Sequence, residues 1–174
     1  MELVRRDHVL ELYHVNDNGI FPNNTLPVII YKRVLNLPSL FASNAIRKLF
    51  KDNNWSNSWK SGVFEYHHYH SITHEVLGIC KGKTTLLLGG DSGAKIEVEK
   101  GDVIIIPAGV AHKNSGTEDQ IICVGAYPEG KDYDMNYGHK SERPAADRKI
   151  AAVPMPTTDP VFGEKGGIML YWKT

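Results

Sequence analysis

The sequence has few cysteines, no excess of charge of either sign and no long apolar run. Its 174 residues include only Cys80 and Cys123, too few for a disulfide framework and without the CxxC spacing used in zinc or redox sites. Both are expected to be small buried side chains. Twenty Lys and Arg balance twenty Asp and Glu, so the chain lacks the cationic surface of a nucleic-acid-binding or polybasic membrane-binding protein. The longest apolar runs, at 86–88 and 103–106, are too short to span a bilayer.

The first fifteen residues carry charges every few positions and lack the apolar segment of a signal peptide, so we predict a cytoplasmic protein. A hydrophobic content of 41% with 23% charged residues is that of a folded globular chain. The length fits a single domain. A net charge of zero also permits self-association.

From about Trp59 the chain is a series of short strand-like segments separated by glycines. Such strands with turns every eight to twelve residues predict a mainly β sandwich or barrel. The glycine-rich run at 89–93 is expected to be a hairpin turn, because it opens no helix and lacks the Lys-Ser/Thr of a phosphate-binding loop. The predicted strands are 60–70, 75–81, 84–88, 95–99, 103–106 and 119–127.

The two ends of the chain differ from this β pattern. Near the N-terminus a short strand is expected at 28–31, and apolar residues at helical spacing predict a helix from Ser39, as its N-cap, to about Lys51. A polar irregular stretch follows Pro128, and the apolar run at 167–172 predicts a last strand. Within one domain, we therefore expect an N-terminal extension (1–58), a β core (59–127) and a segment packing on that core (128–174).

Histidine and glutamate side chains are concentrated in two of the predicted strand regions. In a strand, alternate residues share a face, so His68 and His70 point the same way. A turn then brings Glu75 to the start of the next strand. His112 follows the buried strand 103–106 and a turn at Gly109. If these strands are neighbours, three imidazoles and one carboxylate converge.

Three imidazoles and a carboxylate suit a divalent transition metal. Four protein ligands leave about two positions of a six-coordinate ion open, as Lewis-acid or redox catalysis requires. Tyr66 lies on the same predicted face and is the candidate catalytic acid/base, although aromatic side chains in such positions more often line a barrel. His74 could replace Glu75 or His70 as a ligand. His67 faces the other way and is expected at the surface or an interface.

The spacing of these residues resembles the first motif of the cupin superfamily. That motif is Gly, five residues, His-x-His, three or four residues, Glu, six residues and Gly. Every position is matched here, by Gly62, His68, His70, Glu75 and Gly82.

The second cupin motif follows downstream with one departure. It is Gly, five residues, Pro-x-Gly, two residues, His, three residues and Asn; Gly101, Pro107, Gly109 and His112 match it. Gly116 stands where the family has Asn, and Asn114 lies two residues earlier. More narrowly, the chain resembles the bacterial single-domain cupins of the YjlB type, a likeness that implies no particular activity.

The resemblance implies a double-stranded β-helix, or jelly-roll barrel, that forms a homodimer, with the apolar segments 28–31 and 168–172 as candidates for the interface. It implies one divalent ion (Fe, Mn, Ni or Zn) on His68, His70, Glu75 and His112. The expected function is that of a dioxygenase, decarboxylase or isomerase acting on a small oxygen-rich metabolite, with no nucleic-acid or membrane partner. The alternatives are a non-catalytic protein binding a metal or small ligand, and a metal-free sugar epimerase that uses a His and a Tyr.

Overall fold

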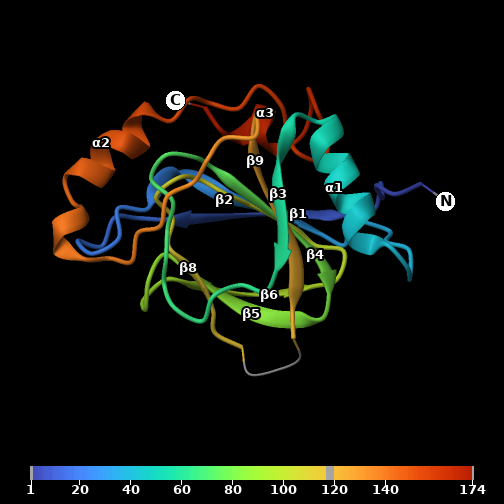
Figure 1. The fold of residues 1–174 in the computed structure, drawn as a ribbon, viewed down its shortest axis with the longest axis horizontal. Helices are drawn as coiled ribbons and strands as arrows, with labels where there is room; N and C mark the ends of the chain where they lie inside the picture. Colours follow the sequence, from blue (N-terminus) through green and yellow to red (C-terminus); the bar gives the residue numbers. More distant parts are fainter. Residues whose placement is uncertain (1, 117–119, 174) are drawn as a thin grey trace.

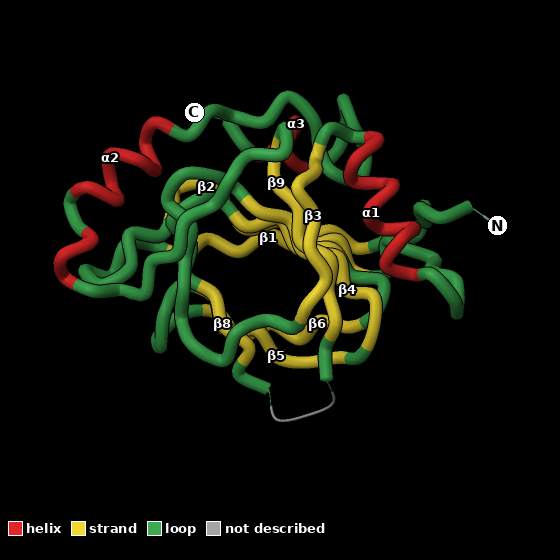
Figure 2. The backbone as a smooth tube through the Cα atoms, in the orientation of Figure 1, coloured by secondary structure: helices red, strands yellow, loops and turns green. Residues whose placement is uncertain are grey.

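Two antiparallel sheets facing each other form the body of the molecule (Figures 1 and 2). The structure is a computed structural model and describes residues 2–116 and 120–173. The larger sheet has the strand order β1-β2-β7-β4-β9-β3, and the smaller has the order β6-β5-β8. The strands are β1 (Val9–Val15), β2 (Asn24–Lys32), β3 (Trp55–Ser61), β4 (Glu75–Lys81), β5 (Lys83–Leu88), β6 (Ala94–Glu99), β7 (Val103–Ile106), β8 (His112–Asn114) and β9 (Ile122–Pro128). The helices are α1 (Ala42–Asp52), the 3-10 turn η1 (Lys140–Glu142), α2 (Ala145–Ala152) and α3 (Gly167–Tyr171).

The central strands of the larger sheet are buried on both faces. Along β4, Leu77 and Ile79 face the small sheet and pack in the interior of the barrel. Val76 and Cys80 face outward into a second apolar cluster, which includes residues of α1 and α3. This double burial explains why β4 and β7 are nearly continuous apolar runs rather than alternating ones.

Helix α1 covers the outer face at β3, β4 and β9 (Figure 1). Its buried side chains are Ile46 and Phe50. They meet β4 at Gly78, where an added Cβ would lie 2.7 Å from Ile46 Cγ2. The helix was predicted, but its N-cap is Phe41 and not Ser39.

Two predicted strands are wrong. A strand was predicted at 60–70, but the observed strand β3 starts earlier and ends at Ser61. The residues that follow it, up to Glu75, form an irregular segment. The predicted final strand, 167–172, is instead the helix α3 with Trp172 beyond it. There the Gly167 N–H donates to the Tyr31 hydroxyl at 2.6 Å, which fixes the start of the helical turn. A short apolar run is compatible with a strand or with a helix. Here the hydrogen bond from Gly167 to Tyr31 favours the helix.

The remaining predicted elements are close to the observed ones. The predicted last core strand, 119–127, corresponds to β9, and residue 119 itself lies outside the described residues. The run 89–93 is the predicted turn of the β5–β6 hairpin. The strand β1 and the helix α2 were not predicted.

The proposed dimer interface at 28–31 and 168–172 is largely wrong. Ile29, Ile30 and Ile168 are fully buried within the chain, so they are not available to a second copy. Only Leu170 and Tyr171 are exposed there. The homodimer itself stays a prediction. Of the described helices, none has the length and apolar character to cross a membrane.

Candidate metal centre

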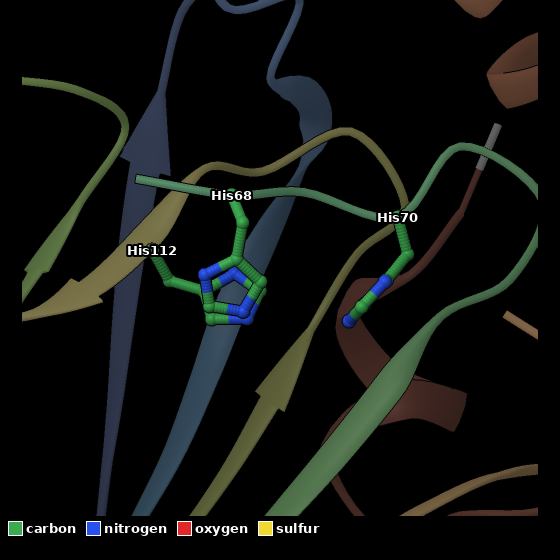
Figure 3. A group of neighbouring side chains, drawn as sticks. All are labelled: His68, His70 and His112. Carbon is green, nitrogen blue, oxygen red and sulfur yellow. The ribbon is translucent and has the colours of Figure 1, made fainter. Parts of the chain in front are cut away.

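The four residues predicted as metal ligands meet inside one end of the barrel. His68 and His70 lie on the irregular segment between β3 and β4, Glu75 opens β4, and His112 opens β8. All four are at least 95% buried. One ligand nitrogen from each of the three imidazoles lies within 4.8 Å of the others (Figure 3).

The segment that carries His68 and His70 is held by backbone pairing with two distant parts of the chain. His68 and His112 exchange both backbone hydrogen bonds, at 3.2 and 3.0 Å. Tyr69 and Asn136 do the same, both at 3.0 Å. Strand-like alternation therefore persists at 68–70, which is why the predicted common orientation of His68 and His70 holds without a continuous strand.

Each imidazole is oriented by a backbone carbonyl on its Nδ1 side. His68 Nδ1 lies 3.2 Å from the carbonyl oxygen of Tyr66, and His112 Nδ1 lies 3.0 Å from that of Val110. His70 Nδ1 lies 2.6 Å from the carbonyl oxygen of Asp134. A carbonyl only accepts hydrogen bonds, so each Nδ1 carries the proton. In a neutral imidazole the Nε2 lone pair is then free to bind a cation.

Glu75 lies against two of these free nitrogens. Its Oε2 is 3.1 Å from His70 Nε2, and its Oε1 is 3.3 Å from His112 Nε2. Two donors bound at about 2.1 Å and at right angles to one ion are about 3.0 Å apart, so these separations fit neighbouring ligands of one metal. His112 Nε2 is fully buried and has no hydrogen bond of good geometry in the described part of the chain. The lone pair of His112 Nε2 and the negative charge of Glu75 repel each other, so this arrangement is favourable only when a proton or a cation lies between them.

Glu75 is in turn held by a chain of hydrogen bonds from the neighbouring strands. The Tyr127 hydroxyl of β9 donates to Glu75 Oε2 at 2.9 Å, and Trp59 Nε1 of β3 donates to the Tyr127 oxygen at 2.7 Å. The indole lies flat over β9 at Gly125, where an added Cβ would come within 2.2 Å of it. Glycine at 125 is therefore required for this contact.

The protonation states suit a cation site. Burial, together with the neighbouring imidazoles His112 and His70, lowers the pKa of His68 to about 3, so this side chain is neutral at pH 7. Burial would raise the pKa of Glu75, but its contacts with His70 and His112 outweigh this and hold it well below its usual range. Burial would lower the pKa of His70, but Glu75 and the Asp134 carbonyl outweigh burial and raise it.

Other predicted residues lie outside the cluster. His74 is buried but faces another part of the core, where its Nδ1 accepts the Ala108 N–H at 2.9 Å, so it does not take the place of Glu75 or His70. His67 points away and lies 2.8 Å from Asp91, as its position in the strand pattern suggested. Tyr66 is 46% exposed and does not line the cavity at the cluster, and an acid/base role for it stays a prediction.

Sequence reasoning missed Trp59, Tyr127 and Asp134. Tyr127 could have been found, because it shares the strand parity of the inward-facing Cys123. Asp134 gave no signal, because it lies in a segment without periodicity. Its carbonyl orients His70 and its carboxylate accepts the N–H of Ser71 at 2.7 Å.

The departure from the second cupin motif has a steric cause. At Gly116 an added Cβ would lie 2.1 Å from Thr84 Oγ1, so an Asn there would have to displace the Thr84 side chain. Asn114 Oδ1 instead accepts the Thr84 hydroxyl at 2.6 Å and the Gly116 N–H at 3.1 Å. Asn114, two residues before the motif position at 116, thus links β8 to β5.

Comparison with known proteins identifies the family. No protein-family model matches the chain. The uncharacterized protein YjlB of Bacillus subtilis (strain 168) is 36% identical over 163 residues, which cover 93% of this chain and 96% of that protein. The chain belongs to the YjlB family.

Two solved structures are similar to part of this chain. Acireductone dioxygenase from Bacillus anthracis, with a cadmium ion in its active centre, has a TM-score of 0.41 and 18% identity over 55% of this chain and 64% of that one. The dTDP-6-deoxy-D-glucose-3,5-epimerase RmlC from Legionella pneumophila has a TM-score of 0.41 and 11% identity, covering 72% and 74%. The predicted likeness to YjlB is confirmed, and the two antiparallel sheets confirm the predicted mainly β, jelly-roll fold class.

Proposed function

We propose that this YjlB-family protein is a metal-dependent enzyme that acts on a small oxygen-rich metabolite. One divalent transition metal, Fe, Mn, Ni or Zn, would be held by His68, His70, His112 and Glu75. The main support is the buried Nε2 of His112, which faces a carboxylate and has no hydrogen bond of good geometry among the described residues. The other two imidazoles are turned the same way by carbonyls on their Nδ1 atoms.

The donor set leaves room for chemistry at the ion. When bound, a divalent ion with four protein ligands supplies Lewis-acid polarisation of a chelated oxygen or a site for dioxygen. The same ligand set serves dioxygenases, decarboxylases and isomerases, and it accepts several metals, so reaction type and metal identity are left to experiment.

The protein side chains position the donors and exclude water. Tyr127 is almost fully buried, and burial together with the negative charge of Glu75 raises its pKa above the usual value. Its hydroxyl therefore stays protonated and acts as a donor that fixes one oxygen of Glu75. Val63, Leu77 and Met135 line the cavity and keep its wall apolar.

The cavity beside the donors is small. Its volume of about 70 Å³ is several times the 10–15 Å³ that a cavity needs to admit one water molecule. A chelating group of a few heavy atoms, such as a hydroxyl–carbonyl pair, an enol or a carboxylate, fits this space. Larger parts of a ligand would extend through the mouth.

Turnover with defined metals tests the proposal. The metal-free protein is reconstituted separately with Fe, Mn, Ni and Zn, then assayed for oxygen consumption and for turnover of enols, keto acids and sugar phosphates. The control is the double variant His68→Ala/His70→Ala. We expect turnover with at least one metal and its loss in the double variant.

Two other results would favour the alternative functions. Turnover of a sugar substrate by the metal-free protein, equal to that of the metal-loaded protein, would indicate a metal-free epimerase. Stoichiometric metal without turnover of any compound in the panel would indicate a non-catalytic binding protein.

A further inference from the structure

Aromatic side chains that are about half exposed lie at the cavity and beside it. These are Phe64 (50%), Tyr66 (46%), Tyr133 (46%) and Tyr137 (44%), which we call the aromatic rim. Large rings of this kind are usually buried, and their grouping at the entrance to a buried polar cluster is typical of a ligand site. Phe64 and Tyr133 also line the cavity itself.

The rim rings are fixed by contacts with one another and with the metal-site imidazoles. Beside His68, Phe64 stacks on Tyr66 with centroids 4.8 Å apart, and its ring meets His68 edge-on at 5.2 Å. Beside His70, Tyr133 stacks on the buried Tyr127 at 5.0 Å and meets His70 edge-on at 5.2 Å. The rim is therefore continuous with the site.

The charge of the cavity restricts the ligands it can accept. Among the described residues that line it, none is Lys or Arg, and the one carboxylate, Glu75, is engaged by His70 and Tyr127. Inside the cavity, a phosphate or carboxylate that is not bound to the metal would therefore meet no cationic side chain, and its desolvation would go uncompensated.

Size and charge together define the substrate class. We propose that the site takes a molecule that carries a metal-chelating oxygen pair on a planar aromatic body without phosphate groups. The oxygen pair enters the small cavity, and the aromatic body packs against Phe64 and Tyr133 of the rim. This inference rests on the proposed function, because it requires a metal beneath the rim.

Two chelators with the same head group test the inference. Acetohydroxamate carries a methyl group and benzohydroxamate a phenyl ring on an identical oxygen pair. The full-length protein is loaded with Co²⁺, whose content is measured first, and titrated with each compound while the visible absorption of the ion is followed. The affinity ratio is compared with that for free Co²⁺ in solution.

The wild-type protein is expected to bind benzohydroxamate at least tenfold more tightly than acetohydroxamate, beyond the ratio for free Co²⁺. Phe64→Ala and, separately, Tyr133→Ala should reduce this ratio several-fold, because each removes ring surface that the phenyl group of benzohydroxamate would contact. The matched control is Phe41→Ala, which removes a 75% exposed ring at the start of α1 and should keep the full ratio.

The contrary outcomes separate the two claims. Stoichiometric Co²⁺ with equal affinity for both compounds, or with no binding of either, would overturn the substrate class and leave the metal site standing. If the preference for benzohydroxamate over acetohydroxamate is unchanged in both Phe64→Ala and Tyr133→Ala, the proposed role of the aromatic rim is wrong. Failure to bind Co²⁺ at all would overturn the proposed function and this inference with it.

Discussion

Removing the hydroxyl of Tyr127 should weaken the metal site without touching a metal ligand. In Tyr127→Phe, Glu75 Oε2 loses a donor at 2.9 Å, and Trp59 Nε1 loses its acceptor at 2.7 Å. The aromatic ring and its stacking on Tyr133 remain. The substitution therefore isolates the hydrogen bonds that hold Glu75 in place.

The expected effect on stability follows from the burial of the lost contacts. Tyr127 is 1% exposed and Glu75 is 3% exposed. A hydrogen bond to a buried charged group is worth about 1.5–3 kcal/mol, and the metal-free variant should lose about that much free energy of unfolding. Removing a group that orients a metal ligand lowers metal affinity by about 10–100-fold, and we expect a loss in this range.

Urea unfolding of metal-free protein and competitive metal titration measure the two effects. The matched control is Tyr133→Phe, because the Tyr133 hydroxyl has no hydrogen-bond partner in the described part of the chain and its loss should change neither quantity by more than a few tenths of a kcal/mol. An unchanged metal affinity in Tyr127→Phe would refute the idea that this hydroxyl positions Glu75.

Three further predictions concern metal binding and packing. Burial lowers the pKa of His74 to about 4, so between that value and the usual 6.5 the unfolded state binds more protons. Through this group the metal-free protein should be about 2 kcal/mol less stable at pH 5.0 than at pH 7.5. His74→Asn, whose amide oxygen can accept the Ala108 N–H, should lose that part of the pH dependence in urea unfolding, and equal dependence in both proteins would contradict this. Gly116→Asn forces a Cβ against Thr84 Oγ1 and should reduce the free energy of unfolding by about 1–3 kcal/mol, whereas an unchanged midpoint would show that β8 relaxes freely. Metal at 100 times its Kd should stabilise the native state by about 2.7 kcal/mol and raise Tm by roughly 5–11 °C, and an equal rise in the double variant would place the metal elsewhere.

The parts of the fold that the sequence predicted are those with strong local patterns. The strands β4 and β7 follow from apolar runs between turn residues, and α1 follows from helical spacing. Along β4, Leu77 lies in the interior of the barrel and Cys80 on the opposite face, as the alternation of side chains in a strand requires. The periodicity of apolar residues is therefore sufficient to predict a helix or strand that has one defined buried face.

The rest depended on contacts between distant residues. The 62–74 segment has no ladder of its own, and His68 is oriented by pairing with His112 and Tyr69 by pairing with Asn136. Tyr127 reaches Glu75 from 52 residues away, and Asp134 reaches His70 from 64 residues away. No local sequence pattern indicates which distant residues will be partners, and these residues meet only when the barrel has closed.

Metal content tests the central claim most directly. The untagged protein and the double variant are purified in parallel, and their metals are measured by mass spectrometry. The account predicts about one equivalent of a divalent transition metal per chain, lost when His68 and His70 are replaced by Ala. No metal in the purified protein, and none taken up after incubation with divalent ions, would contradict it.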